Sequence, residues 1–314
     1  MLGLMAPSHA APAAVATRAQ ALYAKLHNPS AGVFVVAHRG CHNAAPRQGL
    51  GEAPENSQLA LERCVTLGVD MMELDVRRSR DGVLVIMHDA TVDRTTDGSG
   101  QVANFTLAQL KGLHLRQNFG ASMAPTVTAE TVPTLDEMLD AARGRILLNL
   151  DLKADVAEEA ASAVRARGMM DHVLMKEAAP GGIAPLADQP RYRDAAFMPV
   201  VGPWSAGPAA ATLPATVATQ LSATHRPVGV ELVFLSQAQF DQVQPLIAAR
   251  RVRLWVNTLT SVGVVSVVEQ GGDIDALRTD GARWGAMIRA GIDTIQTDEP
   301  GPLLDYLDRE KIRH

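Results

Sequence analysis

The sequence lacks the features that mark several specialised protein classes. It has two cysteines among 314 residues, too few for a disulfide-rich scaffold, and none of the Cys/His spacings typical of a zinc site. No apolar run approaches the roughly 18 residues that cross a membrane, so stable membrane insertion is not expected. Lysine and arginine form no stripe and the net charge is -5, which argues against nucleic acid as a partner. The remaining composition, 47% hydrophobic and 20% charged, is that of an ordinary globular protein.

Two features bear on the compartment in which the chain works. A single disulfide between Cys41 and Cys64 stays open as an alternative, but two unpaired thiols are the favoured interpretation. The small residues Ser8 and Ala10 lie as in a signal-peptidase site, although no positive n-region precedes them. A signal remnant at residues 1–10 therefore slightly favours an exported or periplasmic location over a cytoplasmic one.

From residue 33 onward, short apolar runs alternate with helical stretches, which predicts a parallel sheet. The candidate strands are 33–37, 70–76, 84–87, 146–152, 173–175, 197–201, 228–232, 253–256 and 294–297. They exceed by one the eight strands of a closed (β/α)8 TIM barrel. We expect 228–232 or 173–175 to be the extra one. Candidate helices include 57–67 and 134–143, and Thr134 with Glu137 has the spacing of a capping box.

Three stretches interrupt this alternation. Residues 1–32 form an N-terminal extension with a helical segment at 15–26. Residues 90–135, rich in Thr, Gly and Pro, form a small inserted subdomain after the third strand, and 258–280 form a loop insertion. The rest approaches the roughly 200 residues of a minimal barrel, so we expect residues 33–314 to form one barrel with additions.

Charged residues occupy strand positions that a buried parallel sheet normally fills with apolar side chains. Glu73 and Asp75 are two residues apart, as are Asp151 and Lys153, so each pair shares one face of its strand. Such charges are unfavourable in an interior unless they are paired or bind a metal. Three carboxylates without cysteine or histidine favour Mg²⁺ or Ca²⁺ over zinc.

Two histidines complete this pattern at strand ends, where barrel active sites assemble. His38 and Arg39 follow the first strand, and His88 follows the third. The histidines could serve as general acid and base, and Arg39 with Lys153 suits an anionic phosphate. This set predicts metal-assisted hydrolysis of a phosphate ester. An alternative leaves Glu73 and Asp75 paired to Arg39 and Lys153 with no metal.

Other charged groups are interpreted as surface features. They are Arg77, Arg78 and Arg80 after the second strand, the loop carboxylates Asp273, Asp275 and Asp280, and the histidines His9, His27, His42, His114, His172, His225 and His314. For His42, a contact with the substrate is the alternative left open. The three loop carboxylates lack the spacing and the final Glu of a calcium loop.

Several motifs together resemble the glycerophosphodiester phosphodiesterase family. They are HRG at 38–40, PENS at 54–57, GVDMMELDV at 68–76, DGVLVIMHD at 81–89, DRTT at 93–96 and TDEP at 297–300. The resemblance implies a TIM barrel of the phospholipase-C-like phosphodiesterase type. It also implies a small-molecule substrate, a glycerophosphodiester, cleaved to glycerol 3-phosphate and an alcohol.

The resemblance also implies a role for each matching residue. The catalytic residues are His38, His88 and Arg39, the substrate-binding residues are Arg39, Lys153 and Trp255, and the ligands of one divalent cation, Mg²⁺ or Ca²⁺, are Glu73, Asp75 and Asp151. Glu55 matches a carboxylate that either orients Arg39 or completes the metal shell. Trp255 matches an aromatic residue of the pocket wall.

The sequence departs from the family at three places. Asp151 stands where the family more often has Glu, which shortens that ligand by one methylene. The loop 41–53 and the insertion 258–280 are long for the family, so the shape of the alcohol pocket is left open.

Two other functions remain open. The same site could serve a lysophospholipid or a phosphoinositide headgroup. A non-catalytic barrel that binds phosphorylated ligands is disfavoured, because a degenerate member would lack a histidine or a carboxylate of the set. The sequence gives no indication of the oligomeric state or of the alcohol.

Overall fold

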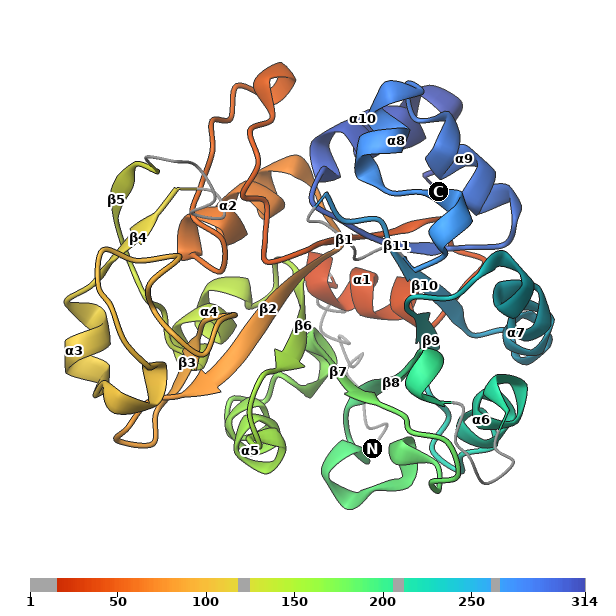
Figure 1. The fold of residues 1–314 in the computed structure, drawn as a ribbon, viewed down its shortest axis with the longest axis horizontal. Helices are drawn as coiled ribbons and strands as arrows, with labels where there is room; N and C mark the ends of the chain where they lie inside the picture. The colour runs from red at the N-terminus through yellow and green to blue at the C-terminus, as the bar shows by residue number, and fades with distance from the viewer. Residues whose placement is uncertain (1–15, 118–124, 206–211, 261–265, 314) are drawn as a thin grey trace, which may run out of the picture.

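Eight parallel strands form a closed barrel in the computed structural model, which describes residues 16–117, 125–205, 212–260 and 266–313 (Figure 1). The strand order is β1-β11-β10-β9-β8-β7-β6-β2, and pairing of β1 with β2 closes the ring. The strands are β1 (Phe34–Ala37), β2 (Met71–Arg78), β6 (Leu147–Leu152), β7 (Val173–Ala178), β8 (Ala196–Val201), β9 (Gly229–Leu232), β10 (Arg253–Asn257) and β11 (Thr294–Thr297). The predicted TIM barrel is confirmed.

The ninth candidate strand is β3 (Leu84–Ile86), so the expectation that 228–232 or 173–175 is the extra strand is wrong. β3 pairs antiparallel with the end of β2, outside the ring of eight. The reason lies in the connection, because parallel neighbours need a crossover of roughly a dozen residues or more. Here Ser79–Val83 forms only a tight turn, with Gly82 at φ 86°.

Helices surround the barrel and cover the outward side chains of its strands (Figure 1). They are α2 (Gln58–Leu67), α4 (Leu135–Ala142), α5 (Ala157–Ala166), α6 (Leu213–Gln220), α7 (Gln237–Arg250), α8 (Asp273–Arg278), α9 (Ala282–Arg289) and α10 (Pro300–Glu310). Thr134 caps α4 with the predicted capping box to Glu137. Outward residues such as Leu74 and Leu150 pack against these helices, so the alternate residues Glu73 and Asp151 face the interior. No helix in the described ranges has the length and apolar character of a membrane crossing.

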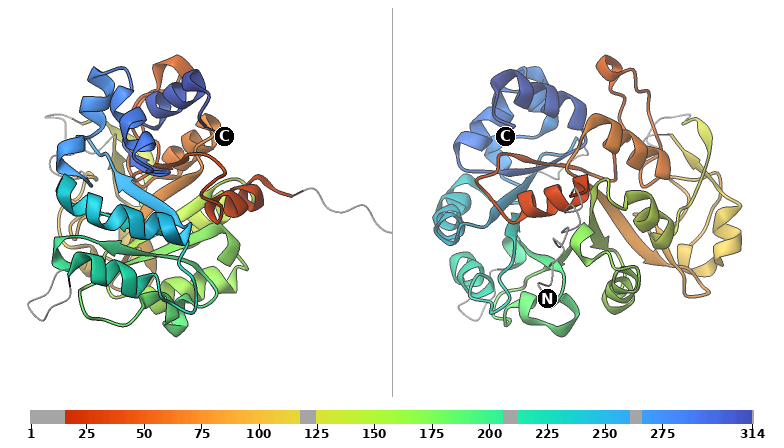
Figure 2. Two further views of the ribbon diagram at one scale, coloured as in Figure 1. Left: turned by 90° about the vertical axis from the view of Figure 1, so that its right-hand side faces the viewer. Right: turned by 180° about the vertical axis from the view of Figure 1, so that it is seen from behind.

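The helix α1 (Arg18–Leu26) lies across the end of the barrel where the strands begin (Figure 2, right). Its Leu22 and Leu26 join the interior apolar cluster that contains Phe34 and Trp255. The buried Arg253 guanidinium, on β10, donates to the carbonyl oxygen of Leu26 and to others in the segment after it. This end is therefore filled, and chemistry is confined to the opposite mouth.

The inserted segment carries its own small core beside the barrel (Figure 1, left). It contains η2 (Val102–Asn104), α3 (Leu107–Lys111) and a hairpin of β4 (His114–Arg116) and β5 (Val127–Thr131). Leu110, Leu115 and Val132 pack there with Val85 and Met87 from β3 and its end. The antiparallel strand β3, which projects from the end of β2 outside the ring, is here called the β3 spur. The inserted subdomain extends from this spur, next to His88.

Candidate active site

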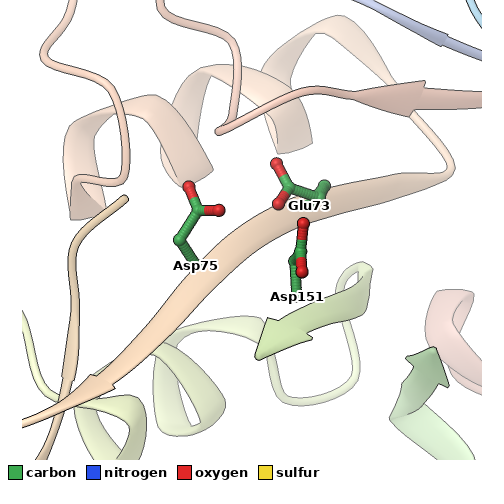
Figure 3. Close-up of side chains that lie close together, drawn as sticks. All are labelled: Glu73, Asp75 and Asp151. Atoms are coloured by element: carbon green, nitrogen blue, oxygen red, sulfur yellow. The ribbon is translucent and has the colours of Figure 1, made fainter. Parts of the chain in front are cut away.

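Three acidic side chains converge on the interior of the barrel mouth (Figure 3). Glu73 and Asp75 lie on β2, and Asp151 stands opposite Asp75 on the neighbouring strand β6. One carboxylate oxygen from each lies within 4.8 Å of the others. The predicted convergence of these residues is therefore found in the structure.

The electrostatics of this cluster fit a cation. Burial, followed by the charges of Asp75 and Asp151, raises the pKa of Glu73 well above its usual value. Burial also disfavours an ionised Asp75, but Lys153 and Arg39 outweigh it and lower the pKa of that carboxyl. Asp75 Oδ1 is buried and accepts no hydrogen bond within the described residues. An all-oxygen donor set of this kind suits a hard divalent ion.

Basic side chains satisfy only part of this negative charge. Lys153 Nζ lies 2.7 Å from Asp151 Oδ2 and 3.3 Å from Asp75 Oδ1. Arg39 Nε lies 3.6 Å from Asp75, whereas Glu73 Oε2 accepts the backbone N–H of Arg39 at 2.7 Å. In the metal-free alternative, basic side chains neutralise both carboxylates of β2. Within the described residues, Asp75 forms such ion pairs, whereas Glu73 accepts only a backbone N–H.

Glu55 orients two arginines and lies outside the carboxylate cluster. It is buried and accepts from Arg39 Nη1 at 3.2 Å and from Arg94 Nη1 and Nη2 at 2.7 and 2.8 Å. Of its two expected roles, the structure supports the orientation of Arg39. Arg94 comes from the inserted segment; it belongs to the DRTT motif, but no role had been predicted for it.

His38 is held by a buried carboxylate from the segment after β11. Its Nδ1 lies 2.7 Å from Oδ1 of Asp298. His38 lowers the pKa of Asp298 well below its usual value despite burial, so Asp298 is ionised and only accepts. The hydrogen therefore resides on Nδ1, and the neutral ring carries its lone pair on Nε2. Burial lowers the pKa of His38 itself, against the opposing effect of Asp298.

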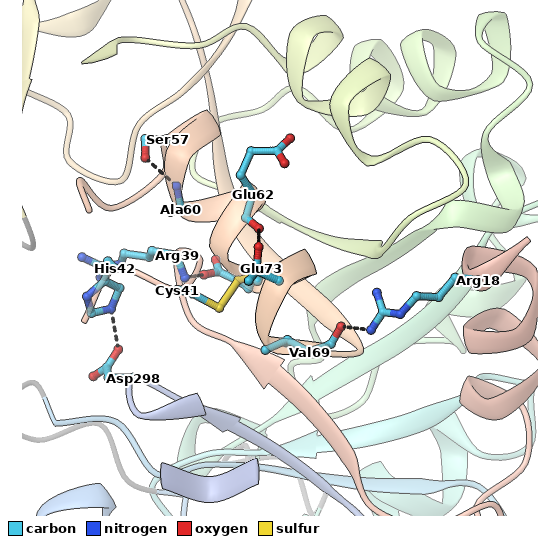
Figure 4. The surroundings of a disulfide bond; sticks show 12 residues. Arg18, Arg39, Cys41, His42, Ser57, Ala60, Glu62, Val69, Glu73 and Asp298 are labelled. Atoms are coloured by element: carbon cyan, nitrogen blue, oxygen red, sulfur yellow. Dashed lines mark hydrogen bonds and ion pairs between the residues drawn. A yellow bond between two sulfur atoms is a disulfide. The ribbon is translucent and has the colours of Figure 1, made fainter. Parts of the chain in front are cut away.

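Asp298 also joins two groups that were interpreted differently from the sequence. His42 is fully buried, with Nε2 3.3 Å from Asp298 Oδ1, so its interpretation as a surface residue is wrong (Figure 4). Asp273, expected in a surface loop, is also fully buried; its Oδ2 accepts the Asp298 N–H at 2.8 Å. Asp273 is the first residue of α8. His172 is likewise buried rather than on the surface.

Asp273 provides a test of this buried network. Burial raises its pKa to about 8, far above the ordinary value of 3.8 for an aspartate. A raised folded-state pKa stabilises the protein below the unfolded value, and this stability is lost as the pH rises towards about 8. We expect Asp273→Asn, which cannot ionise, to gain several degrees of melting temperature relative to the wild type between pH 5 and pH 9. The exposed Asp280→Asn is the control; equal pH profiles for all three proteins would contradict the assignment.

His88 follows the β3 spur and is positioned from two sides. Its Nδ1 lies 2.7 Å from Asp89 Oδ1, and Arg94 Nε donates to Asp89 Oδ2 at 2.7 Å. The Arg77 guanidinium donates to the His88 carbonyl at 2.7 and 2.9 Å, so Arg77 is not merely a solvated charge. The spur that was mistaken for a barrel strand thus brings the second histidine to the mouth.

A disulfide joins Cys41 to Cys64 directly behind this site (Figure 4). The favoured interpretation of two unpaired thiols is wrong, because α2 packs back on the turn that follows β1. Gly40, at φ 85°, makes this approach possible: a Cβ there would lie 2.8 Å from the Ala60 Cβ. The bridge therefore ties the Arg39 turn to α2.

Removing this bridge should weaken the fold. It closes a loop of 23 residues, and loops of that size predict a loss of roughly 3 kcal/mol in unfolding free energy. We expect the double variant Cys41→Ala/Cys64→Ala to unfold at lower denaturant concentration than the wild type. Reductant should lower the wild-type midpoint and leave that of the double variant unchanged. A reductant-insensitive wild type would contradict the pairing.

One cavity of about 570 Å³ unites the predicted catalytic residues. Its lining includes His38, Arg39, His88, Asp151 and Lys153. Trp255 is not among the lining residues, since its side chain is fully buried. It lies on β10 and joins the apolar cluster of the barrel interior.

The sequence interpretation assigned no role to four buried polar residues of the lining, namely Lys176, Glu231, Asn257 and Gln296. They lie on the inward faces of β7, β9, β10 and β11. For Glu231 the signal was present, because it lies between the apolar Val230 and Leu232 just as Glu73 lies between Met72 and Leu74.

Residues 38–179 match the model of the glycerophosphoryl diester phosphodiesterase family. This part of the chain is similar to that family. Residues 197–307 also match a domain of unknown function. The family match contains all the candidate catalytic and metal-binding residues described above.

Individual family members support this assignment. A glycerophosphodiester phosphodiesterase of Caldanaerobacter subterraneus subsp. tengcongensis is 39% identical over 124 residues, which cover 39% of this chain and 46% of that enzyme. The match thus spans less than half of the relative's length.

Solved structures of the family share the fold. A glycerophosphoryl diester phosphodiesterase from Parabacteroides distasonis superposes with a TM-score of 0.67 at 21% identity, covering 93% of this chain and 92% of that one. An Oleispira antarctica phosphodiesterase, solved with the product sn-glycerol-3-phosphate, gives 0.58 at 22% identity, covering 89% and 98%. At these identities the similarity shows the barrel architecture.

Proposed function

We propose that this chain hydrolyses glycerophosphodiesters to glycerol 3-phosphate and an alcohol with the help of one divalent cation. The observation that carries the proposal is one cavity lined by two carboxylate-held histidines, two basic side chains and Asp151, which belongs to a cluster of three carboxylates. The activities of the relatives named above support the reaction class, and the product in the Oleispira structure supports the phosphate ester.

The residues divide into three tasks. Glu73, Asp75 and Asp151 would hold the cation, which when bound supplies positive charge for the phosphate oxygens. Arg39 and Lys153 bind and orient the phosphate by charge-assisted hydrogen bonds. His38 and His88, each fixed by a carboxylate at Nδ1, move protons at Nε2.

The cation is proposed to be Mg²⁺ or Ca²⁺. The supporting argument is the donor set, which has oxygen atoms alone. The side chain of Asp151 is one methylene shorter than that of Glu, so it leaves more room around the cation. That room favours a water ligand in the coordination shell or the larger Ca²⁺. Titration of the metal-free protein with each ion, followed by melting temperature, distinguishes them.

Turnover of glycerophosphocholine tests the whole proposal. We expect release of choline and glycerol 3-phosphate with Mg²⁺ or Ca²⁺, loss of turnover on chelation and recovery when the ion is restored. Equal turnover by the stripped protein would overturn the cation assignment. Absence of turnover with every cation and every glycerophosphodiester would overturn the function.

We also propose that the chain works in an oxidising, exported location. The Cys41–Cys64 bridge supports this, because disulfides persist mainly outside the reducing cytosol. Alkylation of the protein isolated from its native cell is the test. Protected thiols in the exported fraction are expected, whereas freely alkylated thiols in the cytosolic fraction would contradict the proposal.

A further inference from the structure

His42 is a buried polar side chain to which the proposed function gives no task. It lies in the segment that follows β1, and none of its surface is exposed. Its Nε2 lies 3.3 Å from Asp298 Oδ1, and Figure 4 shows the ring turned toward that carboxylate. The Nδ1 of His38 lies 2.7 Å from the same oxygen. One carboxylate oxygen therefore joins two imidazole rings, of which the proposed function uses one.

The charge of Asp298 is compensated by these two rings. Its side chain is fully buried, and among the described residues the two histidines are its ion-pair partners, without a lysine or an arginine. The other oxygen, Oδ2, accepts the N–H and the hydroxyl of Thr260, both at 2.7 Å. Burial disfavours the charged form, but the hydrogen bonds from His38 and His42 lower the pKa of Asp298 well below its usual value. Asp298 is therefore ionised and accepts a hydrogen from each ring.

The two hydrogen bonds on Oδ1 draw on the same charge. A donor stabilises the anion that it faces, so an oxygen that already accepts from His42 holds a proton on His38 less strongly. After burial, the charged groups that act on the pKa of His38 are Asp298, Arg39 and Asp75; Arg39 lowers this pKa, and the two carboxylates raise it. Loss of the His42 hydrogen bond should therefore strengthen the effect of Asp298 and raise the affinity of His38 for a proton.

The chain holds His42 in this place from both sides. The residue before it, Cys41, is fixed by the disulfide to α2. The residue after it, Asn43, donates from Nδ2 to the Asp298 carbonyl at 3.1 Å and to Glu299 Oε1 at 2.8 Å. Glu299 is a second carboxyl near His42, and burial raises its pKa. The segment is thereby anchored to the residues after β11, and a side chain that must orient another needs such support.

A direct contact of His42 with the substrate, which the sequence left open, finds no support in the structure. The side chain is fully buried and is not among the described residues that line the cavity. Any effect of His42 on the reaction must therefore pass through Asp298.

We propose that His42 is a positioning residue that acts through Asp298 on His38: it takes up part of the charge of the carboxylate and fixes the carboxylate that orients the His38 ring. The inference rests on the proposed function, in which His38 moves a proton at Nε2. It also gives a task to the long loop 41–53, which brings the second imidazole to Asp298.

The acidic limb of kcat/KM for glycerophosphocholine tests this role. His42→Phe keeps a ring of similar size but has no donor, so with Mg²⁺ or Ca²⁺ present we expect the limb to move upward by roughly 0.5–1 pH unit. Below the limb, kcat/KM should fall about 3–10-fold, which is the same shift expressed as a rate. His42→Gln, whose amide nitrogen can take the place of Nε2, should restore the wild-type limb. An unmoved limb in His42→Phe, or equal shifts in both variants, would overturn the inference.

His172→Phe is the control for lost stability. His172 is also buried and lies 2.6 Å from an aspartate, but its Nε2 accepts the Gly144 N–H and it does not line the cavity. This variant should lower the melting temperature and leave the limb in place. His42→Leu takes the place of His42→Phe should the ring not pack. A limb that moves as far in His172→Phe as in His42→Phe would attribute the shift to lost stability and overturn the inference.

An NMR titration of the His38 ring separates this inference from the proposed function. The ring signals are assigned by their loss in His38→Asn and are followed without substrate in the protein loaded with Mg²⁺ or Ca²⁺. We expect the upward shift of the titration in His42→Phe and its absence in His42→Gln. This pattern without turnover of any diester would reject the proposed function and leave the positioning role intact. Turnover with a His38 titration that is the same in His42→Phe and the wild type would reject the positioning role and leave the function intact.

Discussion

Replacing Glu73 by Gln is expected to make the metal-free protein more stable while abolishing its response to metal. The neutral amide removes the repulsion with Asp75 and Asp151 that raises the Glu73 pKa. Its oxygen can still accept the Arg39 N–H that Glu73 accepts now. Without one of three carboxylates, however, the site loses charge and a ligand. Turnover of glycerophosphocholine should therefore fall by roughly a thousandfold or more.

The experiment is informative because the variant should gain stability without metal but lose the stabilisation that metal gives the wild type. Thermal unfolding with and without Mg²⁺ or Ca²⁺ measures both, because an ion that binds only the folded state raises its melting temperature. Glu159→Gln is the matched control, since Glu159 forms an exposed ion pair with Arg78 and is not part of the cluster. A Glu73→Gln protein that keeps its metal-induced stabilisation and turnover would reject the carboxylate cluster as the cation site.

The same cluster implies that cation binding is linked to pH. Because the folded-state pKa of Glu73 is raised, a fraction of the metal-free protein holds a proton there that a cation must displace. Affinity should consequently increase as the pH rises through this pKa. This linkage is absent when Gln occupies the position.

The cluster could be predicted because strand alternation carries the information. In β2, the apolar Leu74 and Val76 pack outward, so Glu73 and Asp75 must point inward. The same rule places Asp151 inward on β6, and the pairing of these neighbouring strands then brings the carboxylates together. Applied to the later strands, it would also have found Glu231.

What escaped prediction depends on how distant segments pack. The sequence identifies Asp298 only as part of a motif, because its role requires β11 to pair with β1, from the opposite end of the chain. The burial of Asp273 and His42 follows from the same contact and has no local signal. The disulfide is similar, since 23 residues of separation alone do not show that α2 folds back on the first turn.

The assignment of β3 failed for a different reason. Its apolar run has the composition of a barrel strand, and composition does not distinguish a spur from a strand of the ring. The short connection at Asp81 and Gly82 does distinguish them, because it permits an antiparallel hairpin alone. His88 consequently follows the β3 spur, next to the inserted subdomain that carries Arg94, and does not follow a strand of the barrel ring.

Because the two histidines are held by different parts of the fold, we expect them to have different roles in proton transfer. Burial lowers the pKa of His38 below the ordinary value of 6.5, so its ring is neutral at pH 7 and can accept a proton. His38 is therefore expected to be the general base, and the acidic limb of kcat/KM should lie below pH 6.5. His88, on the more exposed side of the cavity, is left as the general acid that protonates the departing alcohol.

Leaving-group dependence separates these roles. Glycerophosphocholine loses an alkoxide that needs a proton, whereas bis(p-nitrophenyl) phosphate loses a phenolate that does not. We expect His88→Ala to lose roughly 10²–10⁴-fold in rate with the first substrate and less than about tenfold with the second. His38→Ala should lose roughly 10²–10⁴-fold with both, because the attacking nucleophile is common to them.

The exposed His114→Ala provides the matched control, since His114 is also paired with an aspartate but lies outside the cavity. It should retain wild-type rates with both substrates. The reverse pattern, with His38→Ala spared by the phenolate, would exchange the two roles. Equal losses for both variants with both substrates would instead place both histidines in phosphate binding, because a purely electrostatic contact to the phosphate does not depend on the leaving group.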